Sequence, residues 1–181
     1  MSPSRRKDLG DDTVSLDRID SLLLEAIQLD AKASLAALGE VVELSPPAVM
    51  ERLKKLEQAG IIRGYHAHVD GRRVGLDIAA FIGVAVQSPD RMAEIQEWGG
   101  TRPDVLECHH VTGAYTLLLK VKTRNTGALE ELVNALRSMD GVRATDTMIV
   151  FSTAFERTPI PIEVPPEAPA KRRRTNKNNP S

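Results

Sequence analysis

The stretch from Ser45 to Lys55 begins with short residues and continues with cations, reading SPPAVMERLKK. Short side chains let a helix approach the floor of a DNA groove, and a guanidinium or ammonium group can bind a base edge or a phosphate. The candidate DNA contacts in and around this stretch are Ser34, Ser45, Pro46, Pro47, Ala48, Glu51, Arg52 and Lys55. Two other interpretations stay open. The stretch could be the solvated face of an ordinary helical hairpin, and Arg52 could pair with a neighbouring acid instead of contacting a base.

Two short helical patterns position these residues. One begins after Ser34 and the other after Ser45, whose hydroxyls can cap the helices, and a proline is tolerated at the first position of the second helix. Gly39 supplies a small residue where the second helix crosses the first. The expected buried positions are Leu35, Leu38 and Val42, then Val49, Leu53 and Leu56, while Lys54 and Gln58 also face outward. The pair therefore predicts a helix-turn-helix.

A third amphipathic helix precedes this pair and gives it a core. From Asp17 onward, apolar residues recur with helical spacing at Ile19, Leu22, Leu23, Ala26 and Ile27. After Gly60 the pattern becomes strand-like in IIRGYHAHVD, which predicts a wing or a connecting strand. We therefore expect a DNA-binding domain over residues 16–70 and a linker over residues 71–77.

The second half of the chain alternates between strand-like and helical patterns. The expected strands are 78–87, 105–111, 115–122 and 142–155, and the expected helices are 89–98 and 126–139. The order βαββαβ predicts a ferredoxin-like sandwich over residues 78–157, with two helices on one face of an antiparallel sheet. The stretches TLLLKVK and TMIVFSTAF carry apolar residues on both faces of their strands. The sheet face without helices would therefore expose an apolar patch, which predicts that a second subunit covers it in a homodimer.

Composition and the chain ends limit the class of protein. The 181 residues are 27% charged with a formal net charge of −1, so contact with nucleic acid must come from local clusters of cations. A single cysteine, Cys108, and the lack of a long apolar run favour a cytoplasmic protein, which is expected to be nucleoid-associated if it binds DNA. Residues 1–15 and 158–181 are expected to be disordered. The second tail is proline-rich and contains the basic run Lys171–Arg174, which either adds DNA affinity or only solubilises the chain.

Three motifs together resemble the Lrp/AsnC family of feast/famine transcriptional regulators. They are LDRID in the first helix, LSPPAVMERLKKLEQAGIIRGY across the third helix and VLECHHVTGAYTLLLKV in the second domain. The resemblance implies an α+β protein with an N-terminal winged helix-turn-helix domain and a C-terminal ferredoxin-like βαββαβ (RAM-type) domain. It also implies a ligand-responsive regulator that binds palindromic double-stranded operator DNA. Its homodimers would assemble into a higher oligomer, an octamer, and bind a small effector, usually an amino acid, between dimers.

Two positions depart from the family's pattern. The turn between the second and third helices usually holds a glycine, which adopts positive φ without strain, and Glu43 stands there in this chain. The loop that reads Gly-Asp-Tyr-Asp in the family reads Gly113-Ala114-Tyr115-Thr116 here, so it lacks both carboxylates that would face an effector's ammonium group. The effector contacts carried over by position are Val111, Thr112, Gly113, Ala114, Tyr115, Thr116, Thr147 and Met148.

Two rival functions stay open. Siroheme decarboxylases share this two-domain architecture, and His109 or His110 could serve a tetrapyrrole site, although an enzyme has no need of a basic recognition helix. An architectural DNA-binding protein without an effector fits the altered loop and the basic tail. Neither this histidine pair nor His66 with His68 has the further ligands that zinc needs, and no Ser/His/Asp set is visible. We therefore expect no metal, no cofactor and no catalytic residue.

Overall fold

The computed structural model describes residues 15–166, which form two compact units. The first unit combines the residues up to Ala67 with those from Arg157 onward, and the second unit is His68–Glu156. The expected N-terminal arm, apart from residue 15, and the basic run Lys171–Arg174 lie outside the described residues. Among the helices described, none has the length and apolar character needed to cross a membrane.

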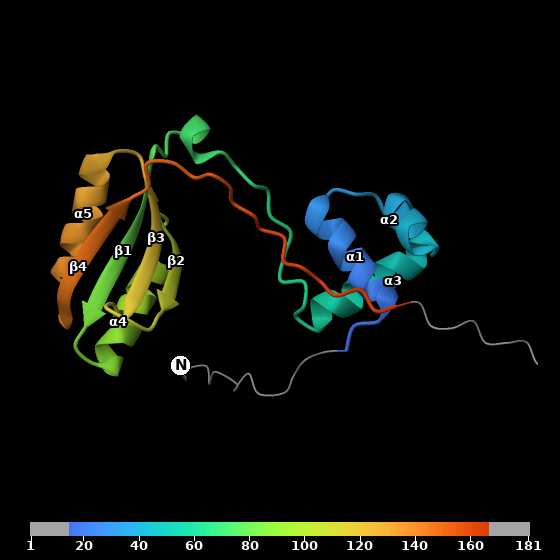
Figure 1. Ribbon diagram of the computed structural model, residues 1–181, viewed down its shortest axis with the longest axis horizontal. Helices are drawn as coiled ribbons and strands as arrows, with labels where there is room; N and C mark the ends of the chain where they lie inside the picture. Colours follow the sequence, from blue (N-terminus) through green and yellow to red (C-terminus); the bar gives the residue numbers. More distant parts are fainter. Residues whose placement is uncertain (1–14, 167–181) are drawn as a thin grey trace, which may run out of the picture. The chain divides into compact units, whose positions relative to one another are not determined.

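Three helices make up most of the first unit (Figure 1): α1 (Arg18–Leu29), α2 (Leu35–Val42) and α3 (Pro46–Gln58). The side chains of Asp17 and Ser34 cap α1 and α2, since each accepts a hydrogen bond from the backbone N–H three residues on, at 2.8 and 3.1 Å. Ser45 stands at the N-cap position of α3, but its side chain accepts no capping hydrogen bond, so that part of the prediction is wrong. Pro46 follows it and has no N–H to satisfy.

One apolar core joins the three helices. The buried stripes predicted for α2 and α3 are confirmed at Leu38, Val42, Val49, Leu53 and Leu56, all at most 9% exposed. On α1 the buried face is wider than predicted, because Leu24 lies in the core together with Leu23 and Ile27. Ile62 and Ile162, which come from outside the three helices, pack against the same core and account for the extra width.

Two segments differ from the prediction. Residues 61–70 form no strand, so the predicted wing is wrong; a strand needs a neighbour to complete its hydrogen bonds, and the structure pairs no strand with this segment. Residues 158–166, expected to begin the disordered tail, instead contact α1: the backbone of Ile160 hydrogen-bonds to Gln28, and Ile162 packs against the core. A short 3-10 helix, η1 (Gly71–Val74), lies in the predicted linker.

The second unit has the predicted order βαββαβ. Its elements are β1 (Ile78–Val86), α4 (Pro89–Gly100), β2 (Val105–His110), β3 (Leu117–Thr123), α5 (Thr126–Arg137) and β4 (Val142–Ile149). The strands are antiparallel in the order β2-β3-β1-β4, which confirms the ferredoxin-like prediction. The last strand ends at Ile149 instead of residue 155: Ile149 pairs with Ala80, and the neighbouring strand β1 begins at Ile78, so β1 is too short at this end to pair with all of residues 150–155.

Helices α4 and α5 pack on one face of the sheet. Ile82 and Val84 of β1 are fully buried in the core between this face and the helices. On the opposite face, the strand register aligns Phe81 of β1 with Lys120 of β3 and Met148 of β4. We call this surface the helix-free face; Phe81 is half-buried and Met148 is 42% exposed. It is the apolar surface that the sequence predicts a second subunit to cover.

A candidate DNA interface and a candidate effector site

A left-handed residue turns the chain between α2 and α3. Glu43 has φ 57° and ψ 40°, and it is the one non-glycine residue with positive φ in the described part of the chain. The backbone N–H of Leu44 donates to the carbonyl oxygen of Gly39 at 3.0 Å, which closes the end of α2. The turn therefore adopts the conformation that suits glycine although a glutamate occupies it, and it stores backbone strain.

Replacing this glutamate should stabilise the protein. Glu43→Gly is expected to raise the free energy of unfolding by about 0.5–1 kcal/mol, because the left-handed conformation costs an L-residue roughly 1–2 kcal/mol and the freedom of glycine in the unfolded chain offsets part of that gain. Urea denaturation followed by circular dichroism measures the change. Glu43→Ala keeps the strain and is the matched control; equal stability of the two variants would contradict the prediction.

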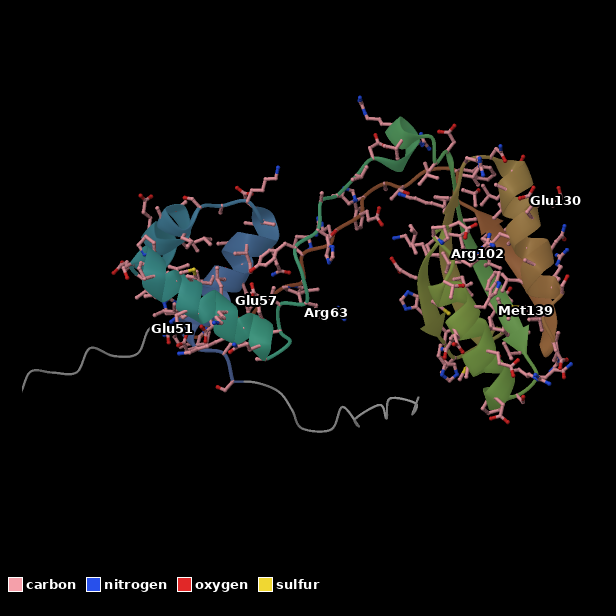
Figure 2. All side chains as sticks on the ribbon, turned by 180° about the vertical axis from the view of Figure 1, so that it is seen from behind. Glu51, Glu57, Arg63, Arg102, Glu130 and Met139 are labelled. Atoms are coloured by element: carbon pink, nitrogen blue, oxygen red, sulfur yellow. The ribbon has the colours of Figure 1, made fainter. Side chains whose placement is uncertain are left out.

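The outward surface of α3 carries most of the predicted DNA contacts. Figure 2 labels Glu51 and Glu57 on this helix. The exposed residues of its outward surface are Pro46, Pro47, Met50, Glu51, Lys54, Lys55 and Gln58, while Ala48 is half-buried. Ser34 and Ser45 are exposed at the N-termini of α2 and α3. Met50 is 55% exposed and was missed from the sequence, although its spacing between Pro47 and Lys54 places it on the same surface.

The lysines of α3 differ in how they are paired. Lys55 Nζ lies 2.8 Å from Glu51 Oε1, so these two predicted contacts partly neutralise each other. Lys54 is exposed and pairs with no acid among the residues that the structure describes. The sequence pattern places Lys54 outward but does not single it out as a contact. Of the two lysines, Lys54 is the one whose charge is available to a partner.

Arg52 forms the ion pair that was left open as an alternative. Its Nη1 lies 2.6 Å from Asp17 Oδ2 and 2.7 Å from Asp20 Oδ1, so the side chain bridges α3 to the start of α1. The hydrogen bonds to Asp17 and then to Asp20 raise the pKa of the guanidinium. The Arg52 side chain is 30% exposed, which leaves it only partly accessible beside the outward surface of α3.

Tyr115 connects the predicted effector loop to the helix-free face. Its ring lies over Gly83 of β1, where a Cβ added to the glycine would come within 2.6 Å of the ring, so only glycine leaves room for it. The Tyr115 hydroxyl donates to Asp146 Oδ2 of β4 at 2.5 Å, and this hydrogen bond raises the pKa of the phenol. Asp146 thus brings to the loop a carboxylate that the loop itself lacks. Strand alternation from Met148 could have placed Asp146 on this face.

The structure brings together only part of the predicted effector set. The loop 111–116 joins β2 to β3, and Thr116 ties it to β1: its N–H donates to the carbonyl of Val84 at 2.9 Å, and its hydroxyl accepts from Val86. Thr147 pairs with the buried Ile82 and shares the helix-covered face, whereas Met148 lies on the helix-free face. Thr147 and Met148 therefore point to opposite faces of the sheet, because adjacent strand residues alternate, and their contact with an effector stays a prediction.

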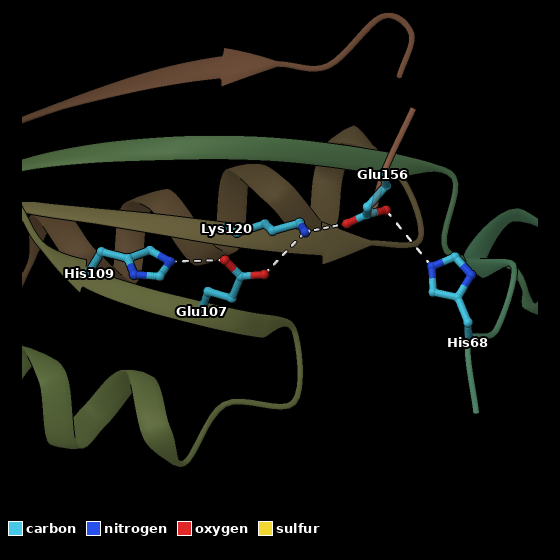
Figure 3. A network of polar contacts seen from close by, with 5 residues as sticks. All are labelled: His68, Glu107, His109, Lys120 and Glu156. Carbon is cyan, nitrogen blue, oxygen red and sulfur yellow. Dashed lines mark hydrogen bonds and ion pairs between the residues drawn. The ribbon is translucent and has the colours of Figure 1, made fainter. Parts of the chain in front are cut away.

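A chain of paired charges follows the helix-free face (Figure 3). Lys120 Nζ contacts Glu107 at 3.1 Å and Glu156 at 2.5 Å, His109 lies 2.9 Å from Glu107, and His68 lies 4.0 Å from Glu156. The bonds from His109 and Lys120 hold the pKa of Glu107 below its usual value, and Lys120 does the same for Glu156. Because the Lys120 ammonium is paired with the carboxylates of Glu107 and Glu156, the face can be covered at a lower desolvation cost.

The histidines do not gather into a metal site. His66 and His68 both lie in the segment that forms no strand, so strand alternation does not place the two side chains on one face. Across residues 15–166, no three His, Cys, Asp or Glu side chains are arranged to hold a metal ion. Cys108 is half-buried, and this burial raises the pKa of its thiol, as expected for a packed cysteine.

Two family models match the chain, one for each unit. The model for the AsnC-type helix-turn-helix domain matches residues 16–57, and the model for the Lrp/AsnC ligand binding domain matches residues 79–160. Among curated proteins, the HTH-type transcriptional regulator FL11 of Pyrococcus horikoshii is 32% identical over 150 residues, covering 83% of this chain and 99% of its own. The regulatory protein AsnC of Escherichia coli K12 is 31% identical over 148 residues, covering 79% and 95%.

Solved structures show the same architecture. A transcriptional regulator of Neisseria meningitidis, solved in complex with L-Met, superposes with a TM-score of 0.77 at 31% identity, over 81% of this chain and 97% of that one. The structure of Escherichia coli AsnC gives a TM-score of 0.71 at 31% identity, over 80% and 98%. These likenesses include both the helical unit and the sheet unit.

Proposed function

Because this chain belongs to the Lrp/AsnC family of transcriptional regulators, we propose that α3 binds the major groove of double-stranded operator DNA. The observation that carries the proposal is the outward surface of α3. Its N-terminal half presents Pro46, Pro47 and the half-buried Ala48, and Lys54 lies about two turns further on without an acidic partner in the described chain. Small residues that enter a groove ahead of a free cation are suited to a DNA-reading helix.

Within this surface the side chains have different roles. Met50 offers an apolar contact of the kind that favours a thymine methyl group, and Lys54 offers a phosphate contact. Ser34 lies at the N-terminus of α2, where a phosphate is favoured. We assign Arg52 to holding α1 against α3, because a base contact would require it to leave both Asp17 and Asp20.

The helix-free face supports a homodimer as the binding species. It combines half-buried and exposed apolar side chains with charges that are already paired, so a second copy could cover it. Two copies of α3 related by a twofold axis would read a palindrome whose half-sites are about 10 base pairs apart, or a multiple of that spacing. Assembly of such dimers into an octamer is part of the same proposal, and the protein would act in the cytoplasm.

Binding to DNA depends on Lys54 in a way that salt can measure. Lys54→Ala is expected to weaken binding to specific and random DNA alike, and to lower the slope of log K against log salt by about 0.9, the contribution of one phosphate contact. Fluorescence anisotropy measures the affinity and its salt dependence, with DNA from upstream of the protein's own gene and with random DNA. Arg124→Ala removes an equal charge from the second unit and should leave the slope unchanged. Wild-type protein with no preference over random DNA would contradict the proposed function itself.

An amino-acid effector at the loop 111–116 is the second part of the proposal. Asp146, held by Tyr115, offers a carboxylate to an ammonium group, and a structural relative was solved with L-Met. We expect at least one of the twenty amino acids to raise the melting temperature. At 100 times its Kd, such a ligand adds about 2.7 kcal/mol to the free energy of unfolding. Asp146→Asn should abolish the rise in melting temperature. The control is Asp77→Asn, which neutralises another exposed carboxylate and should leave the rise in melting temperature unchanged. Silence with all twenty would favour an effector-independent architectural protein.

A further inference from the structure

A groove of about 550 Å³ lies on the first unit, beside the C-terminal half of α1. One wall is the side of α1 that carries Leu24, Ile27 and Gln28, which share a face by helical spacing. Residues 61–66 and 158–162 form the other two walls. The volume falls within the range of about 300–1,000 Å³ that is typical of clefts for small molecules. The groove is therefore large enough to hold a ligand.

Backbone hydrogen bonds hold the two walls that are not helical. After α3, the N–H groups of Ile61 and Ile62 both donate to the carbonyl oxygen of Leu56, at 3.0 and 3.2 Å. On the other wall, the side-chain amide of Gln28 donates to the carbonyl oxygen of Ile160 at 3.2 Å and accepts from its N–H at 2.8 Å. One amide thus satisfies both backbone groups of Ile160. The groove is complete only while this wall lies against α1.

The inner surface of the groove is apolar. Leu24, Ile27 and Ile62 belong to the core of the first unit and are at most 9% exposed. Ile160 and Tyr65, which are 69% and 46% exposed, add apolar surface at the rim. An alkyl chain in the groove would cover this exposed surface and remove it from water. The lining therefore favours a ligand with an aliphatic part.

The polar groups at the rim are cationic or neutral. Arg63, labelled in Figure 2, is exposed and pairs with no acid in the described part of the chain. The ring of His66 lies over Gly64, where an added Cβ would come within 2.8 Å of Nε2. Of the described residues that line the groove, none is an aspartate or a glutamate; Glu57 of α3 instead accepts a hydrogen bond from the Tyr65 hydroxyl at 3.0 Å. A guanidinium without an acidic partner is complementary to a carboxylate.

We propose that this groove binds an aliphatic carboxylate, with its alkyl chain along Leu24 and Ile27 and its carboxylate on the guanidinium of Arg63. The imidazole of His66 offers a further N–H donor at the same rim. Because residues 158–162 form one wall, a bound ligand favours their attachment to α1 by mass action. The site shares no described lining residue with the proposed effector loop or with α3, so it goes beyond the proposed function.

Octanoate is the probe, and isothermal titration calorimetry on the full chain measures its dissociation constant. Octanol and octylamine have the same chain length without the negative charge. We expect octanoate to bind at least about tenfold more tightly than either, the contribution of one charge-assisted hydrogen bond. Arg63→Gln should weaken octanoate binding by the same factor of about ten. The control, Arg124→Gln, removes an equal charge from the second unit and should leave the dissociation constant unchanged.

A second variant fills the groove and leaves its charge in place. Ala31 is exposed and lines the groove, so Ala31→Trp should keep the fold and abolish octanoate binding. Ala36→Trp places the same ring on an exposed position of α2 and should bind like wild type. In the wild-type protein, octanoate should slow hydrogen exchange at the Ile160 amide, which donates to Gln28.

Each result has an outcome that contradicts it. Equal affinity for octanoate, octanol and octylamine, or wild-type affinity in Arg63→Gln, would overturn the carboxylate contact. No binding of octanoate, or binding that survives Ala31→Trp, would overturn the site itself. Unchanged exchange at the Ile160 amide would overturn the coupling to the docked wall. None of these measurements contains DNA, so loss of preference for the upstream DNA would overturn only the proposed function.

Discussion

Gly39→Ala is expected to lower the free energy of unfolding of the first unit by about 1–3 kcal/mol, although alanine is the better helix former. A Cβ at this position would lie 2.4 Å from the carbonyl oxygen of Leu44, which is backbone and cannot move aside without shifting the start of α3. The overpacking therefore outweighs the gain of about 1 kcal/mol in helix propensity. Since the clash separates α2 from α3, operator affinity should fall as well.

The matched control is a glycine in a helix with free space around it. Gly100, the last residue of α4, has no atom within 4 Å of the position that a Cβ would take, so Gly100→Ala should be neutral or stabilising by up to about 1 kcal/mol. Urea denaturation of both variants, followed by circular dichroism, makes the comparison. If Gly39→Ala had the same free energy of unfolding as Gly100→Ala, the crossing of α2 and α3 would be able to relax and the prediction would be wrong.

Phe81→Asp should convert the proposed homodimer into a monomer. Phe81 lies in the middle of the helix-free face, between Lys120 and Met148 in register, so a dimer that buries this face would bury the new carboxylate. Removing a carboxylate from water is costly, and we expect the dimer dissociation constant to rise at least about 100-fold. Sedimentation velocity over a range of concentrations measures the change, and binding to a two-half-site operator should fall with it.

The control for this variant adds the same charge elsewhere. Val74 of η1 is 61% exposed and lies outside the sheet, so Val74→Asp should leave the dimer intact. Circular dichroism must show that Phe81→Asp keeps its fold, which the half-buried position of Phe81 permits. A folded Phe81→Asp protein that sediments like wild type would place the dimer interface on another surface.

The architecture could be predicted because it depends on local patterns. Helical spacing gave the buried stripes at Val49 and Leu53, and the βαββαβ order gave the sheet. The contacts of residues 158–166 could not be predicted, because they join Gln28 to Ile160, two residues 132 positions apart with no shared pattern. The wing failed for a related reason: a strand-like sequence forms a strand only where a partner lies beside it.

The candidate sites were predictable by residue type but not by partner. The sequence predicted that Arg52 faces outward and contacts either a DNA base or an acidic side chain. In the structure Arg52 pairs with Asp17 and Asp20, whose positions on another helix the sequence pattern of α3 does not contain. The loop that holds Tyr115 was located, but the carboxylate beside it, Asp146, comes from β4. Such contacts depend on strand register, and a short pattern in one segment does not contain that information.

The contact between His68 and Glu156 joins the two ends of the second unit, since these residues are its first and last. The whole second unit lies in the chain between the three helices and residues 160–165, which hydrogen-bond to α1, so docking of these residues closes a long covalent loop. The entropy cost of closing a loop falls when its ends are already held together. Folding of the sheet unit therefore makes attachment of residues 160–165 to α1 easier, which couples completion of the helical unit's core to the fold of the sheet unit.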